Sequence, residues 1–381
     1  MALSLLAYNI SDLCLGKPPL RCLAAASSSV SDAIAALRSS EDPFLSIWTC
    51  NHDGDTECEC LGKISMADVI CHLSKNYDTL SALNASVSVL VPKNPSLVLH
   101  VQPSCSLVKA VDLIIEGAQN LIVPIQTKPY TKKKQQNDKV SVTTTHSNGQ
   151  RFCWITQEDI IQFLVGSIAA FSPFPATSIS DLGIINSTHA IVAVDYHCSA
   201  SVVTSAISQA LAVQTSVAVV EGDESFMSLI GEISPMTLTC CDETAAAAVA
   251  TLSAGDLMAF LDGGNPPESL VQDVRNRLQV KGLMGLLSLF DSLLPWSGYS
   301  SEEEFPARTT ALGRSMSSAP RMARKSEAIL CNPKSSLMAV MIQAIAHRVN
   351  YAWVIDKDGC FVGMVTFVDI LKAFRNFLEN I

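Results

Sequence analysis

One structural pattern recurs four times along the 381 residues of this chain. Each copy contains a helix with an apolar stripe, a short β-branched strand, a turn, a second strand that ends in a small hydroxyl residue, and a closing helix. Internal repetition of this kind constrains the fold more strongly than any single residue does. The pattern predicts an α/β chain built from four related units.

The four copies can be followed through their helices and strands. The first copy is expected to have a helix at 30–37, strands at 44–49 and 61–65, and a helix from Met66. The second has a helix from Leu107, strands at 121–126 and 152–156, and a helix from Gln157. The third has a helix at 202–211 and strands at 217–220 and 226–234. The fourth has a helix at 337–347, strands at 351–355 and 361–367 joined by an Asp358-Gly359 turn, and a final helix.

Inserts divide the chain into five segments. We predict copies at 15–80, at 95–175 with a long mobile loop at 127–150, at 178–262 with an Ala-rich helical insert at 235–252, and at 329–381. Segment 263–328 carries two helices followed by a Ser- and Arg-rich linker. The apolar helix at 283–294 either packs between the two halves of the molecule or docks a partner.

A short motif ends the second strand of the first and fourth copies. The sequences are Gly62-Lys-Ile-Ser65-Met-Ala-Asp68 and Gly363-Met-Val-Thr366-Phe-Val-Asp369. A carboxylate at a helix start can accept from two hydroxyl groups of a ligand, and the glycine lets the ligand approach the backbone. A hydroxyl residue followed three positions later by an acid is also the pattern of a helix capping box, so capping remains the alternative at each site.

The motif is altered in the other two copies. In the second copy Cys153 stands where the glycine is expected, before Thr156 and Asp159. In the third copy Ser234 is followed by Pro235, and the acid is missing. Asp256 could replace that acid, but we interpret Asp256 as part of a helix cap.

These motifs in this context resemble the CBS family. The resemblance implies four βαββα CBS motifs paired into two Bateman-type modules, in which the Ser or Thr contacts an adenosyl ligand such as AMP or ATP and the Asp binds its ribose. The residues carried over are Gly62, Ser65, Asp68, Thr156, Asp159, Gly363, Thr366 and Asp369. We rank the pair Thr366 and Asp369 first and the pair Ser65 and Asp68 second.

Four motifs in one chain resemble the γ subunits of AMP-activated and SNF1-related protein kinases, and the opening SDLCLGKPPL resembles plant CBS-domain proteins. His347 and Arg348 match a basic segment of those subunits and are candidate phosphate ligands, although Asn350 and Tyr351 depart from it. The resemblance implies a non-enzymatic nucleotide sensor that regulates a protein kinase complex. The departures keep a neutral adenosyl ligand, and a ligand-free scaffold, as alternatives.

Composition narrows the class of partner and the compartment. The 36 acidic and 26 basic side chains give a net charge of -10, which disfavours binding to nucleic acid or to an anionic membrane. Thirteen cysteines without a CxxC pair predict a reducing compartment, the cytoplasm or the nucleus. No apolar run reaches the roughly 20 residues of a membrane span. No catalytic motif stands in the right context, so we expect neither an enzyme nor a cofactor.

Three further sequence patterns are considered as possible sites: a cluster of cysteines and a histidine, a basic run, and two serines in the linker. Cys50, His52, Cys58 and Cys60 gather in one loop, but their spacing fits no standard zinc motif, so we expect an acidic hairpin loop and no metal. The basic run at 132–134 is interpreted as a solvated loop tip. Ser317 and Ser326 follow basic residues in the linker and are candidate phosphorylation sites.

Overall fold

The computed structural model describes residues 7–49, 58–125, 142–146, 149–187, 191–223, 226–262, 266–293 and 327–380. Within these residues each repeat forms a three-stranded sheet. A short first strand runs parallel to the middle strand, and the third strand pairs with the middle strand in the antiparallel sense. The βαββα unit expected from the sequence is therefore present in all four repeats.

The elements of each repeat follow one another in the expected order. Repeat 1 contains β1 (Cys22–Ala24), α2 (Val30–Arg38), β2 (Phe44–Thr49), β3 (Glu59–Ser65) and α3 (Met66–Ser74). Repeat 2 contains β4 (Val98–His100), α5 (Leu107–Ile115), β5 (Asn120–Ile125), β6 (Arg151–Thr156) and α6 (Gln157–Gly166). Repeat 3 contains β7 (Ala193–Asp195), α7 (Ala200–Val213), β8 (Val217–Asp223), β9 (Phe226–Ile233) and α8 (Pro235–Cys240). Repeat 4 contains β10 (Leu330–Cys331), α13 (Leu337–Ala346), β11 (Tyr351–Ile355), β12 (Phe361–Thr366) and α14 (Phe367–Glu379).

The remaining helices lie outside these units. They are α1 (Ile10–Leu13), α4 (Thr79–Asn84), α9 (Ala245–Thr251), α10 (Ala254–Leu261), α11 (Glu268–Val280) and α12 (Met284–Leu293). Short 3₁₀ turns occur at Val87–Leu90, Pro95–Leu97, Ile168–Phe171 and Phe174–Ala176.

The glycine of the motif shapes the strand that carries it. The register of the hairpin shifts directly beside Gly62, Gly231 and Gly363, where one residue of the third strand is left without a partner. In repeat 2, where Cys153 replaces the glycine, the register runs on without a shift. The bulge thus accompanies the glycine, as expected for a residue that tolerates irregular backbone.

The repeats pair through their sheets. Between repeats 1 and 2, the rings of Trp48 and Phe152 lie 5.0 Å apart in a buried aromatic cluster. Between repeats 3 and 4, buried Glu232 accepts hydrogen bonds from the Tyr351 hydroxyl at 3.0 Å and from Trp353 Nε1 at 2.6 Å. These contacts form the two modules that the resemblance to the CBS family implied.

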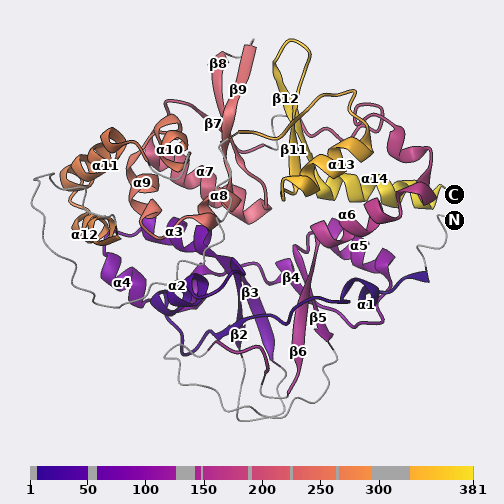
Figure 1. Cartoon of the computed structure of the whole chain (residues 1–381), viewed down its shortest axis with the longest axis horizontal. Coiled ribbons are helices and arrows are strands. Elements are labelled where there is room, and N and C mark those ends of the chain that lie inside the picture. Colours follow the sequence, from indigo (N-terminus) through magenta and orange to yellow (C-terminus); the bar gives the residue numbers. More distant parts are fainter. Residues whose placement is uncertain are drawn as a thin grey trace, which may run out of the picture.

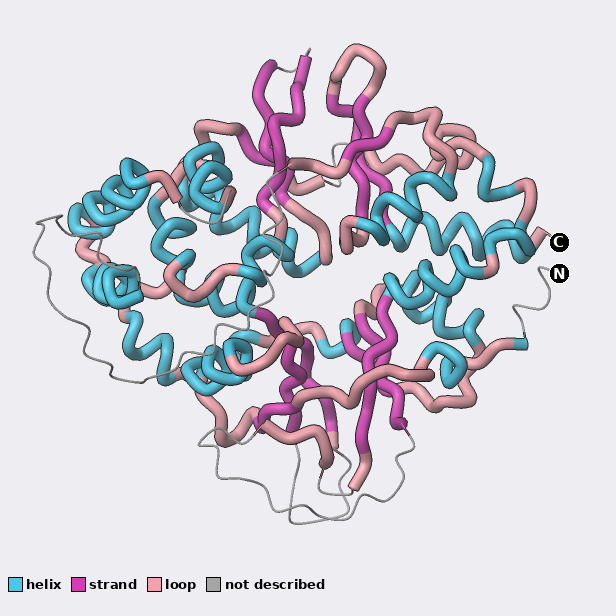
Figure 2. The backbone as a smooth tube through the Cα atoms, viewed as in Figure 1, coloured by secondary structure: helices cyan, strands magenta, loops and turns pink. Residues whose placement is uncertain are grey.

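The two modules pack together through their helices. Figure 1 shows repeats 1 and 2 below and repeats 3 and 4 above, and Figure 2 shows most of the helices between the outer strands. One apolar core joins repeat 1 to repeat 3, and another joins repeat 2 to repeat 4. Arg375 on α14 also pairs with Asp112 on α5 at 2.7 Å. The four repeats therefore enclose a common centre.

Helix α12 packs between the modules, as the first of the two alternatives predicted. It contacts α4 of the lower module and α9 of the upper one, and Phe290 is fully buried. Gly285 makes the close approach feasible, because a Cβ there would lie 2.7 Å from Thr79 Oγ1. The apolar face of this helix is therefore covered from within the chain.

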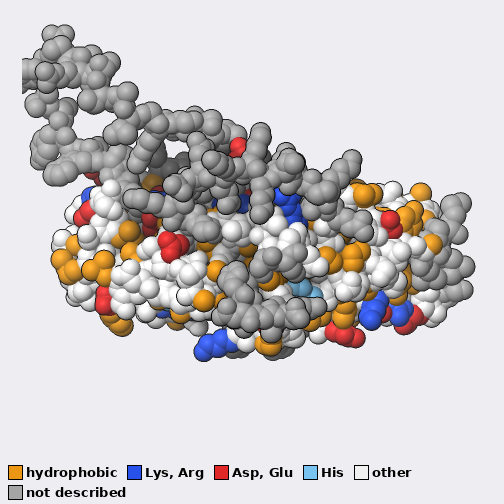
Figure 3. All heavy atoms as spheres, turned by 90° about the horizontal axis from the view of Figure 1, so that it is seen from below, with side chains coloured by type: hydrophobic (Ala, Val, Ile, Leu, Met, Phe, Trp, Pro, Cys, Tyr) orange, Lys and Arg blue, Asp and Glu red, His pale blue; other side chains and the backbone are white. Residues whose placement is uncertain are grey.

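Several predictions fall on residues outside the described ranges. These are Cys50, His52, the basic run at 132–134, Ser317, Ser326, and most of the loop at 127–150. Among the described residues, no group of three potential metal ligands is found, and no helix is long and apolar enough to cross a membrane. Figure 3 shows charged side chains scattered among hydrophobic and uncharged ones on the described part of one face.

Candidate functional site: a central cavity and three capped carboxylates

A cavity of about 220 Å³ lies where the four repeats meet. Each repeat contributes to its lining through the residues at the end of a third strand or the start of a middle strand. The polar contributors include Ser65, Asp68, Thr156, Glu158, Ser234 and Arg348. Residues with equivalent places in the four repeats are therefore brought to one site.

Repeat 1 presents its motif to this cavity. Asp68 Oδ2 accepts from the Ser65 amide at 2.7 Å and from Ser65 Oγ at 2.9 Å, which completes a capping box at the start of α3. Burial raises the pKa of the Asp68 carboxyl to about 6, while the bonds from Ser65 act in the opposite direction. The motif caps a helix and also lines a cavity, so the two interpretations made from sequence are compatible here.

Two basic side chains are found among the described lining residues. Lys63 lies between Gly62 and Ser65, and its Nζ is 3.8 Å from the centre of the Phe44 ring. Burial lowers the pKa of Lys63 to about 8. Arg348 adopts a φ of 54°, in the left-handed region that few non-glycine residues occupy.

An acidic side chain accompanies these cations. Burial and the neighbouring Asp159 raise the pKa of Glu158, while Lys63 and Arg348 act to lower it. The cavity thus places cations and carboxylates side by side. Such a site can accept from hydroxyl groups of a ligand and also neutralise an anionic group.

The motif of repeat 4, ranked first from the sequence, does not line this cavity, and its place as a ligand site stays a prediction. Asp369 Oδ2 accepts from the Thr366 amide at 3.0 Å, from Thr366 Oγ1 at 2.5 Å, and from Asn186 Nδ2 at 2.5 Å. A Cβ at Gly363 would lie 2.2 Å from the Asn186 carbonyl oxygen. Gly363 is therefore required by the close approach of the chain's own backbone, independently of any ligand.

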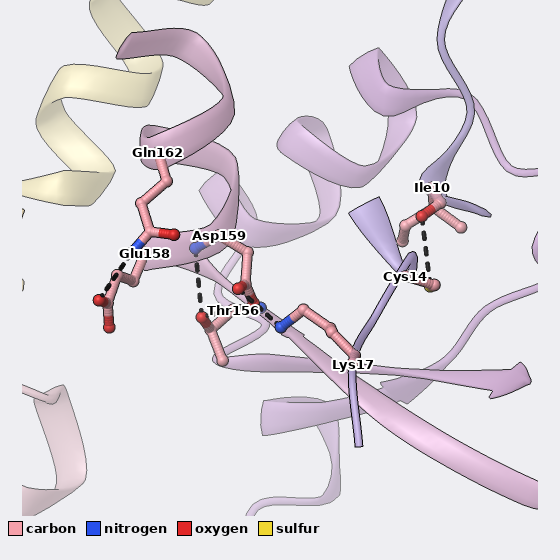
Figure 4. A network of polar contacts seen from close by, with 7 residues as sticks. All are labelled: Ile10, Cys14, Lys17, Thr156, Glu158, Asp159 and Gln162. Atoms are coloured by element: carbon pink, nitrogen blue, oxygen red, sulfur yellow. Dashed lines mark hydrogen bonds and ion pairs between the residues drawn. The ribbon is translucent and has the colours of Figure 1, made fainter. Parts of the chain in front are cut away.

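Repeat 2 is engaged in a similar way. Asp159 Oδ2 accepts from the Thr156 amide at 2.7 Å and from Thr156 Oγ1 at 2.9 Å. Its other oxygen, Oδ1, lies 2.6 Å from Lys17 Nζ, and Figure 4 shows Lys17 reaching this carboxylate from the N-terminal segment. Thr156 lines the cavity, whereas Asp159 is paired beside it.

The third repeat and the basic segment of the fourth each place one of their predicted residues in the lining of the cavity. Ser234 lines the cavity and accepts from the Met236 amide at 3.2 Å. Asp256 lies in the first turn of α10, where Ser253 accepts from its amide, and it pairs with Arg277 at 3.5 Å. His347 is exposed at the end of α13 and does not line the cavity, unlike Arg348.

Sequence reasoning missed the partners of these carboxylates. Lys63 lies inside the quoted motif, yet only the glycine, the hydroxyl and the acid of that motif were singled out. Lys17 and Asn186 follow two copies of the same tetrapeptide, Ile-Ser-Asp-Leu, which begins at Ile10 and again at Ile179. That internal repeat was the signal that could have revealed them.

Comparison with known proteins identifies the family to which these repeats belong. A family model for the CBS domain matches residues 322–376. An Arabidopsis thaliana protein, CBS domain-containing protein CBSX5, is 81% identical over the whole of both chains. A second Arabidopsis protein, SNF1-related protein kinase regulatory subunit gamma-like PV42b, is 21% identical over 85% of this chain and 78% of its own length.

A solved structure shares the overall fold. A Methanocaldococcus jannaschii protein, described as a proposed archaeal homologue of γ-AMPK, has a TM-score of 0.54 and 12% identity. The match covers 96% of this chain and all of that one. At this identity the likeness concerns the fold alone.

Four βαββα units, paired through their sheets into two modules around a shared centre, define a tandem CBS-domain protein. The 81% identity to CBSX5 along the full chain is specific enough to establish kinship. The chain belongs to the family of CBS domain-containing proteins.

Proposed function

We propose that this protein is a non-enzymatic regulator that binds one adenosyl nucleotide in the central cavity and thereby changes the activity of a protein partner. The observation that carries this proposal is the cavity itself, which all four repeats line and whose lining includes Asp68, Ser65, Lys63 and Arg348. Asp68 would accept from the ribose hydroxyls, since a fixed carboxylate can receive two such bonds. Lys63 and Arg348 would attract the phosphate.

Regulation would follow from the position of the cavity. A ligand that contacts both modules favours the arrangement of the modules that it binds best, and it shifts a partner's activity by that differential affinity. The gamma-like name of the relative PV42b points to a SNF1-related kinase complex as the class of partner. For this chain the kinase remains a proposal.

The first test measures thermal unfolding with AMP, ADP, ATP and S-adenosylmethionine, each added separately. A ligand at 100 times its dissociation constant adds about 2.7 kcal/mol to the free energy of unfolding. We expect a shift in the wild-type protein that disappears in Asp68→Ala. Asp369→Ala is the matched control, because it removes the same motif residue from a site that Asn186 fills, and it should retain the shift.

A second candidate function is a ligand-free scaffold. The pairing of Asp159 with Lys17 and of Asp369 with Asn186 favours it, because these motifs then serve as structural caps. No thermal shift with any of the four compounds would favour the scaffold. Co-purification with the kinase subunits, with and without nucleotide, would then show whether a partner binds independently of ligand.

A further inference from the structure

Three segments of the chain share one path across a neighbouring repeat, and we name them straps. The first strap is residues 8–17 on repeat 2, the second is residues 85–94 on repeat 1, and the third is residues 177–186 on repeat 4. In each case the first residue of the strap accepts from the first amide of an opening helix. These bonds are Leu107 N to Tyr8 O at 2.9 Å, Val30 N to Ala85 O at 3.0 Å, and Leu337 N to Thr177 O at 2.9 Å.

The first and third straps match more closely still. Ile10 and Ile179 are fully buried, and their amides donate to Cys105 O at 2.8 Å and to Ser335 O at 3.0 Å. The next amides, of Ser11 and Ser180, donate to equivalent prolines of repeats 2 and 4, at 3.0 Å each. The same tetrapeptide therefore makes the same contacts on two repeats.

In the first and third straps, the residue seven places after the buried isoleucine contacts the motif carboxylate. Lys17 lies seven places after Ile10, and Asn186 lies seven places after Ile179. Lys17 Nζ is 2.6 Å from Asp159 Oδ1, and Asn186 Nδ2 donates to Asp369 Oδ2 at 2.5 Å. Two different polar side chains thus reach the equivalent carboxylate from the equivalent place.

The second strap behaves differently. The residue seven places after Val87 is Asn94, which lines the central cavity, but its side-chain oxygen accepts from the Ser96 amide at 3.1 Å and from Ser96 Oγ at 2.7 Å. The atom nearest a Cβ at Gly62 would be Val91 Cγ1, at 2.6 Å, rather than a backbone carbonyl. Asn94 therefore caps a local turn, and Asp68 faces the cavity.

We propose that Lys17 and Asn186 are internal occupants of the ribose-binding carboxylates of repeats 2 and 4, and that one chain consequently takes up a single nucleotide at Asp68. This inference rests on the proposed function and determines which repeats can serve it. The ammonium of Lys17 and the amide of Asn186 donate where ribose hydroxyls would donate. The strap side chain, rather than the motif, then decides whether a repeat is open to ligand.

Isothermal titration calorimetry of the full chain with AMP and with ATP tests the proposal. The wild-type protein should bind one nucleotide per chain, and Asp68→Ala should remove that binding. Asn186→Ala should add a second site that Asp369→Ala abolishes, and Lys17→Ala should add one that Asp159→Ala abolishes. Asn94→Ala truncates the equivalent strap residue, which bonds to Ser96, and it should add no second site, whatever its effect on affinity at the central cavity that Asn94 lines. Circular dichroism verifies that each variant is folded.

The outcomes separate this inference from the proposed function. If the wild type binds one nucleotide through Asp68 and the folded strap variants gain nothing, the occupant role of Lys17 and Asn186 is overturned and the sensor remains. If the wild type already binds at Asp369 or Asp159, the occupant role is likewise overturned. If the wild type binds neither compound but Asn186→Ala binds one through Asp369, the occupant role holds and the proposed function fails. If no variant binds, both are overturned.

Discussion

At the scale of single residues, the cavity contains an acid and a base whose ionisation is shifted toward neutral pH. Burial raises the pKa of Asp68 to about 6 and lowers that of Lys63 to about 8. Both groups are charged between these values. A ligand that needs a carboxylate acceptor and a cation should therefore bind best within this window.

This arrangement predicts a bell-shaped pH profile for nucleotide binding. At pH 5 Asp68 is mostly protonated, and at pH 9 Lys63 is mostly neutral, so the affinity for AMP should fall about tenfold at each extreme relative to pH 7. Asp68→Asn should flatten the acidic limb and Lys63→Met the basic limb. Calorimetric titrations at a series of pH values provide the measurement, and a flat wild-type profile would contradict the assignment.

The same carboxyl makes a prediction about stability without ligand. The pKa of Asp68 rises from the ordinary 3.8 to about 6 on folding, so the folded state binds the proton more tightly. Its contribution to stability is present below pH 4 and is lost as the pH rises through about 6. Asp68→Asn should therefore gain stability relative to wild type as the pH rises from 4 to 7. Urea unfolding at both pH values measures this, and Asp32→Asn, in the cap of α2, controls for loss of a capping acid.

At the scale of elements, the straps are held against strands as well as against helices. Asn186 exchanges backbone hydrogen bonds with Met364 on β12, at 2.8 and 3.0 Å, directly beside Gly363. A side chain at Gly363 would collide with the Asn186 carbonyl oxygen, and that oxygen belongs to backbone that cannot rotate away. The glycine is required here by its own chain.

Substitution of this glycine should consequently destabilise the protein before any ligand is considered. Gly363→Ala should cost about 1–3 kcal/mol, because the third strap must shift to admit a methyl group. Gly166→Ala at the end of α6 has no heavy atom within 4 Å of its Cβ and should lie within about 0.5 kcal/mol of wild type. Chemical denaturation compares the two variants, and equal losses would argue against a tight strap.

At the scale of the whole molecule, each apolar core crosses the boundary between the modules. Repeat 1 shares a core with repeat 3, and repeat 2 shares one with repeat 4. Helix α12 adds Phe290 to the first of these cores and contacts α4 of one module and α9 of the other. Neither module can separate without exposing a large apolar surface, so the two should unfold together.

Truncation of the Phe290 side chain on α12 should lower the stability of both modules together. Phe290→Ala should cost about 3–5 kcal/mol and should lower the temperature of one cooperative transition. Met284→Ala, on the same helix at a residue that is 60% exposed, should have little effect. Differential scanning calorimetry measures the number of thermal transitions. Two separate transitions in Phe290→Ala would show that the modules unfold independently and would contradict the prediction.

Much of the fold could be predicted from the sequence because its signals are local. The β-branched strands, the Asp358-Gly359 turn and the hydroxyl-to-acid spacing each act within a few residues. The turn forms with Gly359 at a φ of 83°, and the spacing forms capping boxes at Ser65, Thr156 and Thr366. Repetition of these signals indicated four related units, and the resemblance of their motifs to the CBS family implied the pairing.

The choice among the carboxylates could not be predicted in the same way. Asp68, Asp159 and Asp369 stand in nearly the same local sequence, and each caps its own helix. Their surroundings in the folded chain distinguish them. Asp159 contacts Lys17 and Asp369 contacts Asn186, each from a distant segment, whereas Asp68 lines the cavity. Local spacing determines which residues form a capping box, whereas packing between remote segments determines what each capped carboxylate contacts, because a strap and its strand meet only after the repeats have assembled.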